Sequence, residues 1–252
     1  MLLTKLFRAA STKLSSVSII STKSQAISAV ETLYKYKDRV HAWDTETINV
    51  NIKEESPVGN GTVICASAFI GPEVNFGSGP KLFLDNFGES KGLIDVFKDY
   101  FEDPSIYKVW HNYGFDRHIL KNHNINVQGF GGDTMHMARL ANPSRGPGEY
   151  SLSSCSSHYN GLMSKIKNKL LSDLSIEYKD KEEVIAQLQL YNKSTKLKVK
   201  KTMEELFAYH KTLKSGVESK LLTVPSVEEL HTKPEYYETW VTYATMDAVF
   251  NI

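Results

Sequence analysis

Four carboxylates and one tyrosine in this sequence have the chemistry of a site for divalent metal ions. They are Asp44 and Glu46 in AWDTET, Asp116 in WHNYGFDRHIL, and Tyr243 with Asp247 in YATMDAVF. Carboxylate oxygens are the ligands that hard cations such as Mg²⁺ prefer. Two such cations about 4 Å apart are well suited to displacement at phosphorus. The set therefore predicts a two-metal site, with phosphodiester hydrolysis as its reaction.

This chemistry gives each of the five side chains an expected role. Asp44 would bridge two metal ions, and Glu46 and Asp247 would complete the ion that activates water. Asp116 would hold the second ion, largely through water. Tyr243 would position the attacking water through its hydroxyl group, as a neutral phenol.

Asp44 and Glu46 are two residues apart on a predicted strand, so their side chains leave the same face of the sheet. Ala42 and Trp43 precede them, which indicates the end of a buried strand. Carboxylates there are costly unless they are paired or bind a cation. For a lone Asp-x-Glu the simpler interpretation is a strand end in solvent, because the pattern is short and common.

The remaining candidates come in pairs four residues apart, the spacing of one helix face. Asn112 and Asp116 lie at a predicted junction between a strand and a helix, where Asn112 could equally be a helix cap and nothing more. Tyr243 and Asp247 lie in a predicted helix whose first turn holds Pro234. Taken alone, Tyr243 fits a core aromatic residue as well as a site residue.

A mixed sheet with helices on its faces is expected to position these side chains. Short runs rich in branched and aromatic residues predict strands, and apolar residues at helical spacing predict helices. The predicted strands are 39–44, 61–69, 80–85 and 107–112, and the predicted helices are 89–102, 113–123 and one that begins near residue 234. A meander of strands followed by helix, strand and helix predicts an α/β fold.

Three segments together resemble a known family. AWDTET, the continuous run 101–140 and YATMD are similar, in this order, to the three motifs of the DEDDy group of 3′–5′ exonucleases. The similarity is greatest to the proofreading domain of family A DNA polymerases, including organellar ones, and covers about residues 37–160 and 234–250. It implies a ribonuclease-H-like mixed β-sheet flanked by helices, two Mg²⁺ or Mn²⁺ ions, and removal of nucleotides from single-stranded or frayed 3′ DNA ends. It also implies catalytic roles for the same five side chains.

The resemblance further implies four contacts with the nucleic-acid strand. It places Asn112 and Phe115 near the bound strand, and Val50 where an apolar wedge enters between the last bases. Arg145 lies where the family often has a strand-contacting arginine. Stacking and wedging accept any base, which suits an exonuclease without sequence preference. Asp133 begins a family-like DTM run and is predicted to be structural.

Length and composition fit one domain of moderate size. The chain has 252 residues, and its net charge of +1 does not by itself favour a polyanionic partner. Its two cysteines are too few for a disulfide framework. No apolar run approaches the ~20 residues that span a bilayer, so no membrane association is expected.

Residues 164–201 are rich in lysine, with ten lysines against five acidic residues. A basic insertion of this kind is most often a solvated surface. The alternative is an electrostatic guide for a polyanion.

The first 26 residues have the composition of a mitochondrial presequence. Basic residues and serines are frequent, and no acidic residue precedes Glu31. A secretory signal fits less well, because no apolar core of about 7–15 residues follows the charges. A disordered basic tail is the alternative. The exonuclease domain is therefore expected to begin near Ile27, to continue to residue 252, and to act in the mitochondrial matrix.

Two other functions stay open at this point. A ribonuclease D-like exonuclease that trims RNA shares these motifs. A subunit that binds nucleic acid without catalysis would partner a separate polymerase chain, although the intact set of metal ligands argues against it. The short sequence after Asp247 is compatible with a stand-alone exonuclease and with a fragment of a split polymerase gene.

Overall fold

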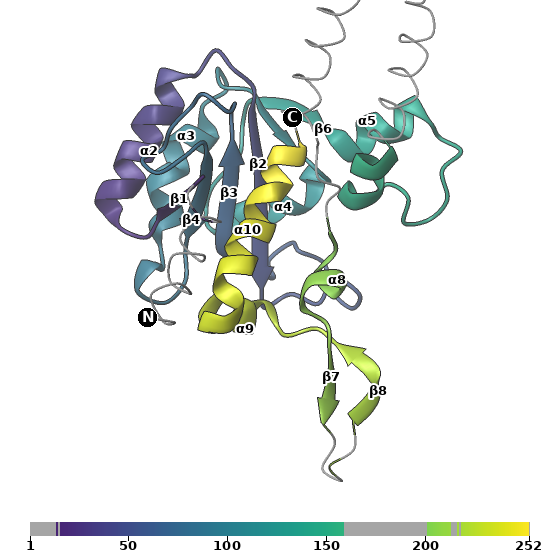
Figure 1. Cartoon of the computed structure of the whole chain (residues 1–252). Coiled ribbons are helices and arrows are strands. Elements are labelled where there is room, and N and C mark those ends of the chain that lie inside the picture. The colour runs from purple at the N-terminus through teal and green to yellow at the C-terminus, as the bar shows by residue number, and fades with distance from the viewer. Residues whose placement is uncertain (1–13, 15, 159–200, 213–215, 217, 252) are drawn as a thin grey trace, which may run out of the picture.

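The computed structural model describes residues 14, 16–158, 201–212, 216 and 218–251. Its centre is a six-stranded mixed sheet in the order β1-β4-β3-β2-β5-β6 (Figure 1). Its strands are β1 (Val17–Ile20), β2 (His41–Ile48), β3 (Thr62–Phe69), β4 (Lys81–Asp85), β5 (Lys108–Trp110) and β6 (Phe130–Asp133). Strand β3 is antiparallel to β2 and β4, whereas β5 and β6 continue parallel to β2. This topology confirms the predicted α/β fold with a ribonuclease-H-like mixed sheet.

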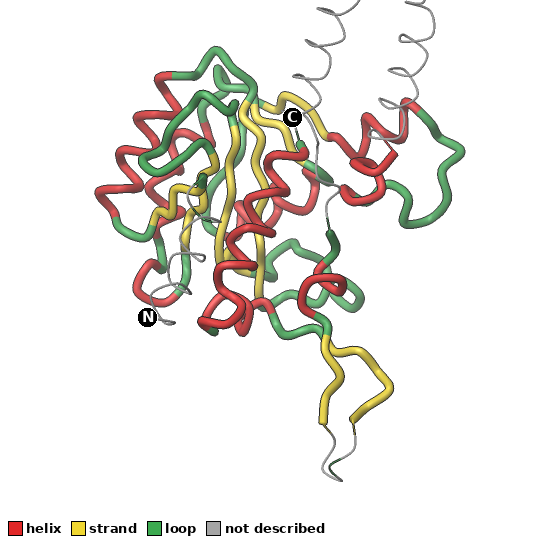
Figure 2. Tube along the Cα trace, viewed as in Figure 1, coloured by secondary structure: helices red, strands yellow, loops and turns green. Residues whose placement is uncertain are grey.

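Helices cover both faces of this sheet (Figure 2). The helices of the described part include α2 (Lys23–Lys35), α3 (Lys98–Glu102), α4 (Tyr113–Asn122), α5 (Thr134–Ala141), α8 (Met203–Phe207), α9 (Val227–Thr232) and α10 (Pro234–Phe250), with 3₁₀ turns η1 (Gly88–Ser90) and η2 (Leu93–Phe97). Strands β7 (Tyr209–Thr212) and β8 (Glu218–Thr223) form a separate hairpin that projects from the domain. Among these helices, none is long and apolar enough to cross a bilayer.

The sheet separates two apolar layers, because successive side chains of a strand point to opposite faces. In β4, Leu82 and Leu84 join the layer that contains α2 residues, and Phe83 joins the opposite layer. Trp240 and Val241 of α10 pack in that second layer. Helix α10 therefore crosses one face of the sheet, over β2, β3 and β4.

The predicted helix over 89–102 is interrupted, although Ile94, Phe97, Tyr100 and Phe101 are buried. Gly92 adopts a left-handed conformation with φ of 90° between the two 3₁₀ turns. The Asn86 side-chain oxygen accepts hydrogen bonds from the backbone N–H groups of Gly92 and Ile94, each at 3.0 Å. These side-chain hydrogen bonds replace helical ones, so the regular α-helix starts only at Lys98.

The folded part begins earlier than the expected start near Ile27. Strand β1 pairs in parallel with β4 and buries Val17 and Ile20. Helix α2 follows behind a capping box formed by Thr22 and Gln25. The serines and lysines around β1 resemble the composition of a presequence. The apolar side chains of β1 nevertheless complete the edge of the sheet.

Two sequence interpretations concern residues whose placement is not described. Half of the presequence predicted for residues 1–26 falls on residues 1–13, which lie outside the described part of the chain, whereas β1 and the start of α2 occupy most of the other half. The lysine-rich insertion at 164–201 likewise lies outside it, except for Lys201. Both interpretations stay predictions.

A buried polar network supports β2 on the side away from α10. The Tyr100 hydroxyl lies 2.8 Å from both Trp43 Nε1 and His41 Nδ1, and His41 Nε2 lies 3.0 Å from the Tyr36 carbonyl oxygen. A carbonyl only accepts, so Nε2 carries the proton and Tyr100 donates to Nδ1. The neutral imidazole thus satisfies every partner, and burial lowers the pKa of His41.

This network predicts that the domain loses stability in mild acid. The ordinary histidine pKa is about 6.5. Below this pH, His41 binds a proton in the unfolded chain but stays neutral in the folded chain until the pH is lower. The stabilisation is therefore complete above that pH and falls as the pH decreases. The free energy of unfolding in urea should decrease less between pH 8 and pH 5 for His41→Gln than for the wild type. Equal falls in both proteins would contradict the role of His41.

Candidate metal and active site

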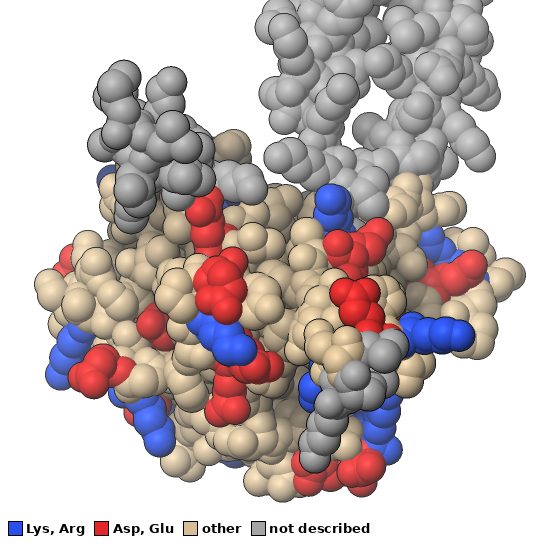
Figure 3. Space-filling view, turned by 60° about the horizontal axis from the view of Figure 1, so that its bottom comes forward, with Lys and Arg blue, Asp and Glu red and all other residues tan. Residues whose placement is uncertain are grey.

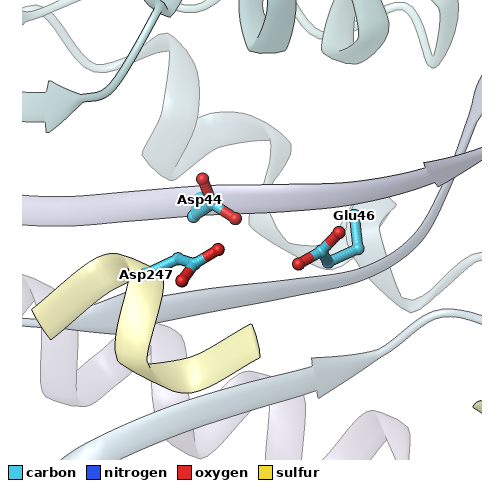
Figure 4. A group of neighbouring side chains, drawn as sticks. All are labelled: Asp44, Glu46 and Asp247. Atoms are coloured by element: carbon cyan, nitrogen blue, oxygen red, sulfur yellow. The ribbon is translucent and has the colours of Figure 1, made fainter. Parts of the chain in front are cut away.

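Asp44, Glu46 and Asp247 form a cluster of three carboxylates on one face of the sheet (Figure 4). One oxygen atom from each side chain lies within 4.8 Å of those of the other two. Asp44 and Glu46 share a face of β2, as their two-residue spacing predicts, and Asp247 reaches them from α10. The fold thus brings together three of the four predicted metal ligands, although about two hundred residues separate them in the sequence.

Two side-chain hydrogen bonds fix helix α10 around Asp247. Ser67 Oγ of β3 donates to the carbonyl oxygen of Ala244 at 2.8 Å. Asn251, one turn after Asp247, donates from Nδ2 to the carbonyl oxygen of Trp43 at 3.1 Å. Trp43 directly precedes Asp44, so Asn251 ties the end of α10 to the strand that carries the other two carboxylates.

Sequence reasoning missed Ser67 and Asn251. Ser67 lies in an apolar strand and is buried, and a buried hydroxyl group needs a hydrogen-bond partner. Asn251 follows Asp247 by four residues, the spacing of one helix face. The sequence thus contains two signals, a serine in an apolar strand and an asparagine four residues after Asp247. Neither signal specifies the hydrogen-bond partner.

Asp116 lies beside β2 but outside the three-carboxylate cluster. Its Oδ1 accepts hydrogen bonds from the backbone N–H and the hydroxyl of Thr45, at 3.1 and 2.6 Å. Strand β5 pairs with β2 only at His41 and Ala42, so the edge of β2 is open at Thr45. Burial raises the pKa of Asp116 to about 7, against the opposing effect of the Thr45 hydrogen bonds. A cation nearby would lower that pKa and keep the carboxylate charged.

Tyr243 lies one turn before Asp247 and is both a core residue and a neighbour of the cluster. Its ring stacks on Trp240 at a centroid distance of 5.9 Å and meets Phe207 edge-on at 6.2 Å. Burial, followed by the charges of Asp247 and Glu46, raises the pKa of Tyr243 well above its usual value. The phenol therefore stays protonated and offers a neutral hydroxyl group.

Asp133 is structural, as predicted, because its carboxylate caps the starts of two helices. Its Oδ1 accepts from the backbone N–H groups of Asn112, Met135 and His136, at 3.0, 2.9 and 3.3 Å. Its Oδ2 accepts from Tyr113 N–H at 2.8 Å. An anion is favourable at a helix N-terminus. This single side chain thus positions both α5 and the helix α4 that carries Asp116.

Asn112 occupies the N-cap position of α4 in a left-handed conformation, with φ of 66°. Asn112 therefore holds the N-cap position that the sequence suggested, but its side chain makes no capping hydrogen bond. Asp133 takes the helix N–H groups instead. Asn112 lines the wall of a cleft.

This cleft has a volume of about 700 Å³ and opens beside the carboxylate cluster. Asp44 and Asp247 contribute to it from the cluster, and Asn112, Arg139 and Arg145 line its walls. This cleft therefore holds two of the four residues predicted to contact the nucleic-acid strand, Asn112 and Arg145, together with two of the predicted metal ligands.

The other two residues predicted to contact the nucleic-acid strand do not line this cleft. They are Val50 and Phe115. Both are half-buried and pack against the apolar layer that contains Trp43. The structure therefore places them at the edge of the core, and their contact with a strand stays a prediction.

Known proteins are similar to this chain over most of its length. Residues 17–194 match a family described as the 3′–5′ exonuclease of the DNA polymerase A type. The chain is 37% identical over 221 residues to DNA polymerase I A, chloroplastic/mitochondrial, of Arabidopsis thaliana, covering 85% of this chain and 18% of that protein. It is 35% identical over 239 residues to DNA polymerase I B, mitochondrial, of Oryza sativa subsp. japonica, covering 92% and 20%. The chain thus spans about a fifth of the length of these relatives.

A solved structure of Escherichia coli RNase D, an exoribonuclease involved in structured RNA processing, is also similar. The TM-score is 0.41 at 19% sequence identity, and the match covers 57% of this chain and 33% of that one. A likeness at this level does not bear on the substrate.

Proposed function

Because the chain belongs to the 3′–5′ exonuclease family of the DNA polymerase A type, we propose that it removes nucleotides stepwise from the 3′ end of DNA. The cluster of Asp44, Glu46 and Asp247 carries this proposal. It lies beside a cleft that also presents Arg145, so the same space offers acidic groups for metal ions and a basic group for the strand.

The donor set fits two divalent cations, Mg²⁺ or Mn²⁺. Three carboxylates with oxygens within 4.8 Å repel one another unless positive charge neutralises them. In the proposed site Asp44, Glu46 and Asp247 would hold the cations, and Asp116, which accepts hydrogen bonds from Thr45, would assist. When bound, the ions supply an activated water and stabilise negative charge on the attacked phosphate and the leaving 3′ oxygen.

The chain's own side chains complete this mechanism. The Tyr243 hydroxyl, kept neutral by burial and by the neighbouring carboxylates, hydrogen-bonds to the attacking water and orients it. Asn112 and Arg145 bind the strand in the cleft. Val50 and Phe115, stiffened by packing against the core, present apolar groups to the terminal bases.

Tyr243→Phe should slow the reaction by about 10- to 100-fold, because it removes only the hydroxyl that orients water. The phenylalanine ring retains the packing on Trp240 and Phe207, so thermal unfolding should be unchanged. The measurement is kcat on a labelled single-stranded oligonucleotide at saturating Mg²⁺. A rate equal to that of the wild type would remove water positioning from the mechanism.

We propose DNA as the natural substrate, with proofreading-like action and a polymerase chain as the partner. Support comes from the names of the relatives, which are organellar DNA polymerases. The same names support an organellar location, and the mitochondrial matrix is the specific proposal. Rates on DNA and RNA strands of one sequence test the substrate, and a clear preference for RNA would favour the ribonuclease D-like alternative.

One experiment tests the activity itself. The full chain is incubated in Mg²⁺ with a 5′-labelled linear single strand and, separately, with a closed circular single strand. We expect a ladder of products that shorten from the 3′ end of the linear strand, an intact circle, and no digestion with excess chelator. Cleavage of the circle would indicate an endonuclease, and undiminished digestion in chelator would reject the metal site.

A further inference from the structure

Binding of a strand by this domain depends on local charge. The face that Figure 3 shows carries acidic and basic side chains interspersed, and it offers no broad basic surface among the described residues. The chain as a whole has a net charge of only +1. Non-specific affinity for DNA comes from contacts between cations and phosphates, and basic side chains in the cleft are placed to supply such contacts.

Two arginines share one tyrosine ring on the wall of the cleft. The guanidinium carbon of Arg139 lies 5.3 Å from the centre of the Tyr150 ring, and that of Arg145 lies 6.0 Å from it. All three residues line the cleft that contains Asp44 and Asp247. Neither the sequence motifs nor the family resemblance pointed to Arg139 or Tyr150.

The tyrosine and one of the arginines are held in place by hydrogen bonds. Tyr150 donates its hydroxyl to the carbonyl oxygen of Asn142, directly after α5, at 3.0 Å. Arg145 donates from Nη1 to the carbonyl oxygen of Glu149 at 3.0 Å. The loop after α5 therefore folds back on the helix and fixes the ring, while Arg139 reaches that ring from the exposed side of the helix.

The arrangement places two positive charges around one ring, each no more than 6.0 Å from its centre, and like charges repel. Attraction to the face of a single aromatic ring partly offsets the repulsion. A phosphate offsets it further, because the planar guanidinium group matches the geometry of phosphate oxygens. Two guanidinium groups around one ring, in a cleft that also holds Asp44 and Asp247, thus fit a ligand with several phosphates, of which one lies at the carboxylates.

We propose that Arg139, together with Arg145 on the Tyr150 ring, forms a subsite for backbone phosphates of the strand upstream of the bond to be cleaved. This inference rests on the proposed exonuclease function and adds a binding determinant to it. Because the subsite contacts phosphates other than the reacting one, it acts on strand binding and not on the chemical step. It binds backbone charge and therefore accepts any sequence.

The decisive comparison uses two substrates and two arginine variants. Binding of a fluorescent single-stranded oligonucleotide is followed by anisotropy in excess chelator, and hydrolysis of thymidine 5′-p-nitrophenyl phosphate, which has no upstream phosphate, is followed in Mg²⁺. Arg139→Ala should weaken oligonucleotide binding about tenfold. It should also reduce the slope of log affinity against log salt by about 0.7, the value for one lost phosphate contact on a single strand. Hydrolysis of the small ester should be unchanged.

Arg39→Ala is the matched control. Arg39 also lies over a tyrosine, 5.2 Å from the centre of the Tyr36 ring, but it does not line the cleft. Its removal should leave oligonucleotide binding and the salt slope unchanged. Tyr150→Ala should weaken binding, whereas Tyr150→Phe keeps the ring and should retain most of the affinity.

Several results would overturn the subsite. Wild-type affinity and salt slope in Arg139→Ala would show that Arg139 contacts no phosphate. An equal fall in hydrolysis of the small ester would place Arg139 in the chemical step or in the fold, and Arg139→Gln with a thermal melt would separate those two cases. Failure of the wild type to hydrolyse either substrate would reject the proposed function, and the binding measurement in chelator would still test the subsite.

Discussion

Asp44→Ala should abolish Mg²⁺-dependent digestion of a 3′ end, with a loss of at least about a thousandfold in rate. Asp44 belongs to the carboxylate cluster and, like Asp247, also lines the cleft. Its removal takes away one of the three carboxylates that would hold the cations. Asp44→Asn keeps the shape of the side chain and should lose nearly as much, because the amide cannot supply the negative charge.

The same variants should fold normally. Without metal ions, removal of one of three mutually repelling carboxylates should leave the melting temperature of Asp44→Ala unchanged or raise it. The rise in melting temperature that Mn²⁺ gives the wild type should be lost in the variant. Asp38→Ala, at an exposed acidic residue just before β2, is the control and should behave as the wild type in both measurements. Digestion at the wild-type rate by Asp44→Ala would remove the basis of the metal mechanism.

Asp133→Ala should produce the largest loss of stability among the residues around the site. Its carboxylate accepts four backbone N–H groups at the starts of α4 and α5, and each lost cap costs about 1–2 kcal/mol. We expect a decrease of about 2–4 kcal/mol in the free energy of unfolding, measured in urea. Catalysis should fall as well, even where the variant is folded, because α4 carries Asp116.

Thr22→Ala is the comparison for this loss. Thr22 caps only α2, at an exposed position far from the cluster, and its removal should cost about 1 kcal/mol without changing the rate. Asp133→Asn keeps one carbonyl oxygen and should recover part of the stability. A loss in Asp133→Ala no greater than that in Thr22→Ala would contradict the double-cap role.

Local pattern was sufficient to predict several features of this domain. The two-residue spacing of Asp44 and Glu46 places both side chains on one face of β2, because alternation is a property of the strand itself. Pro234 begins α10, as its fixed backbone angle favours. The strands around these residues follow from short branched and aromatic runs.

Features that depend on distant backbone groups were not predictable in this way. The left-handed Gly92 interrupts a helical pattern because the Asn86 side chain takes its N–H group. Val17–Ile20 becomes a strand because the edge of β4 is available for pairing. Asp116 binds Thr45 because β5 leaves the edge of β2 open at that residue.

The sequence alone thus predicts which side chains are suited to bind metal ions or a nucleic-acid strand, and how they are spaced along each element. Which of them meet depends on the tertiary structure. Asp247 reaches Asp44 because α10 buries its apolar side on one particular face of the sheet. Arg139 and Arg145 contact the same Tyr150 ring because a loop folds back on α5. Periodicity is a property of a few neighbouring residues, whereas these contacts depend on which apolar faces are buried together and on which backbone groups then need partners.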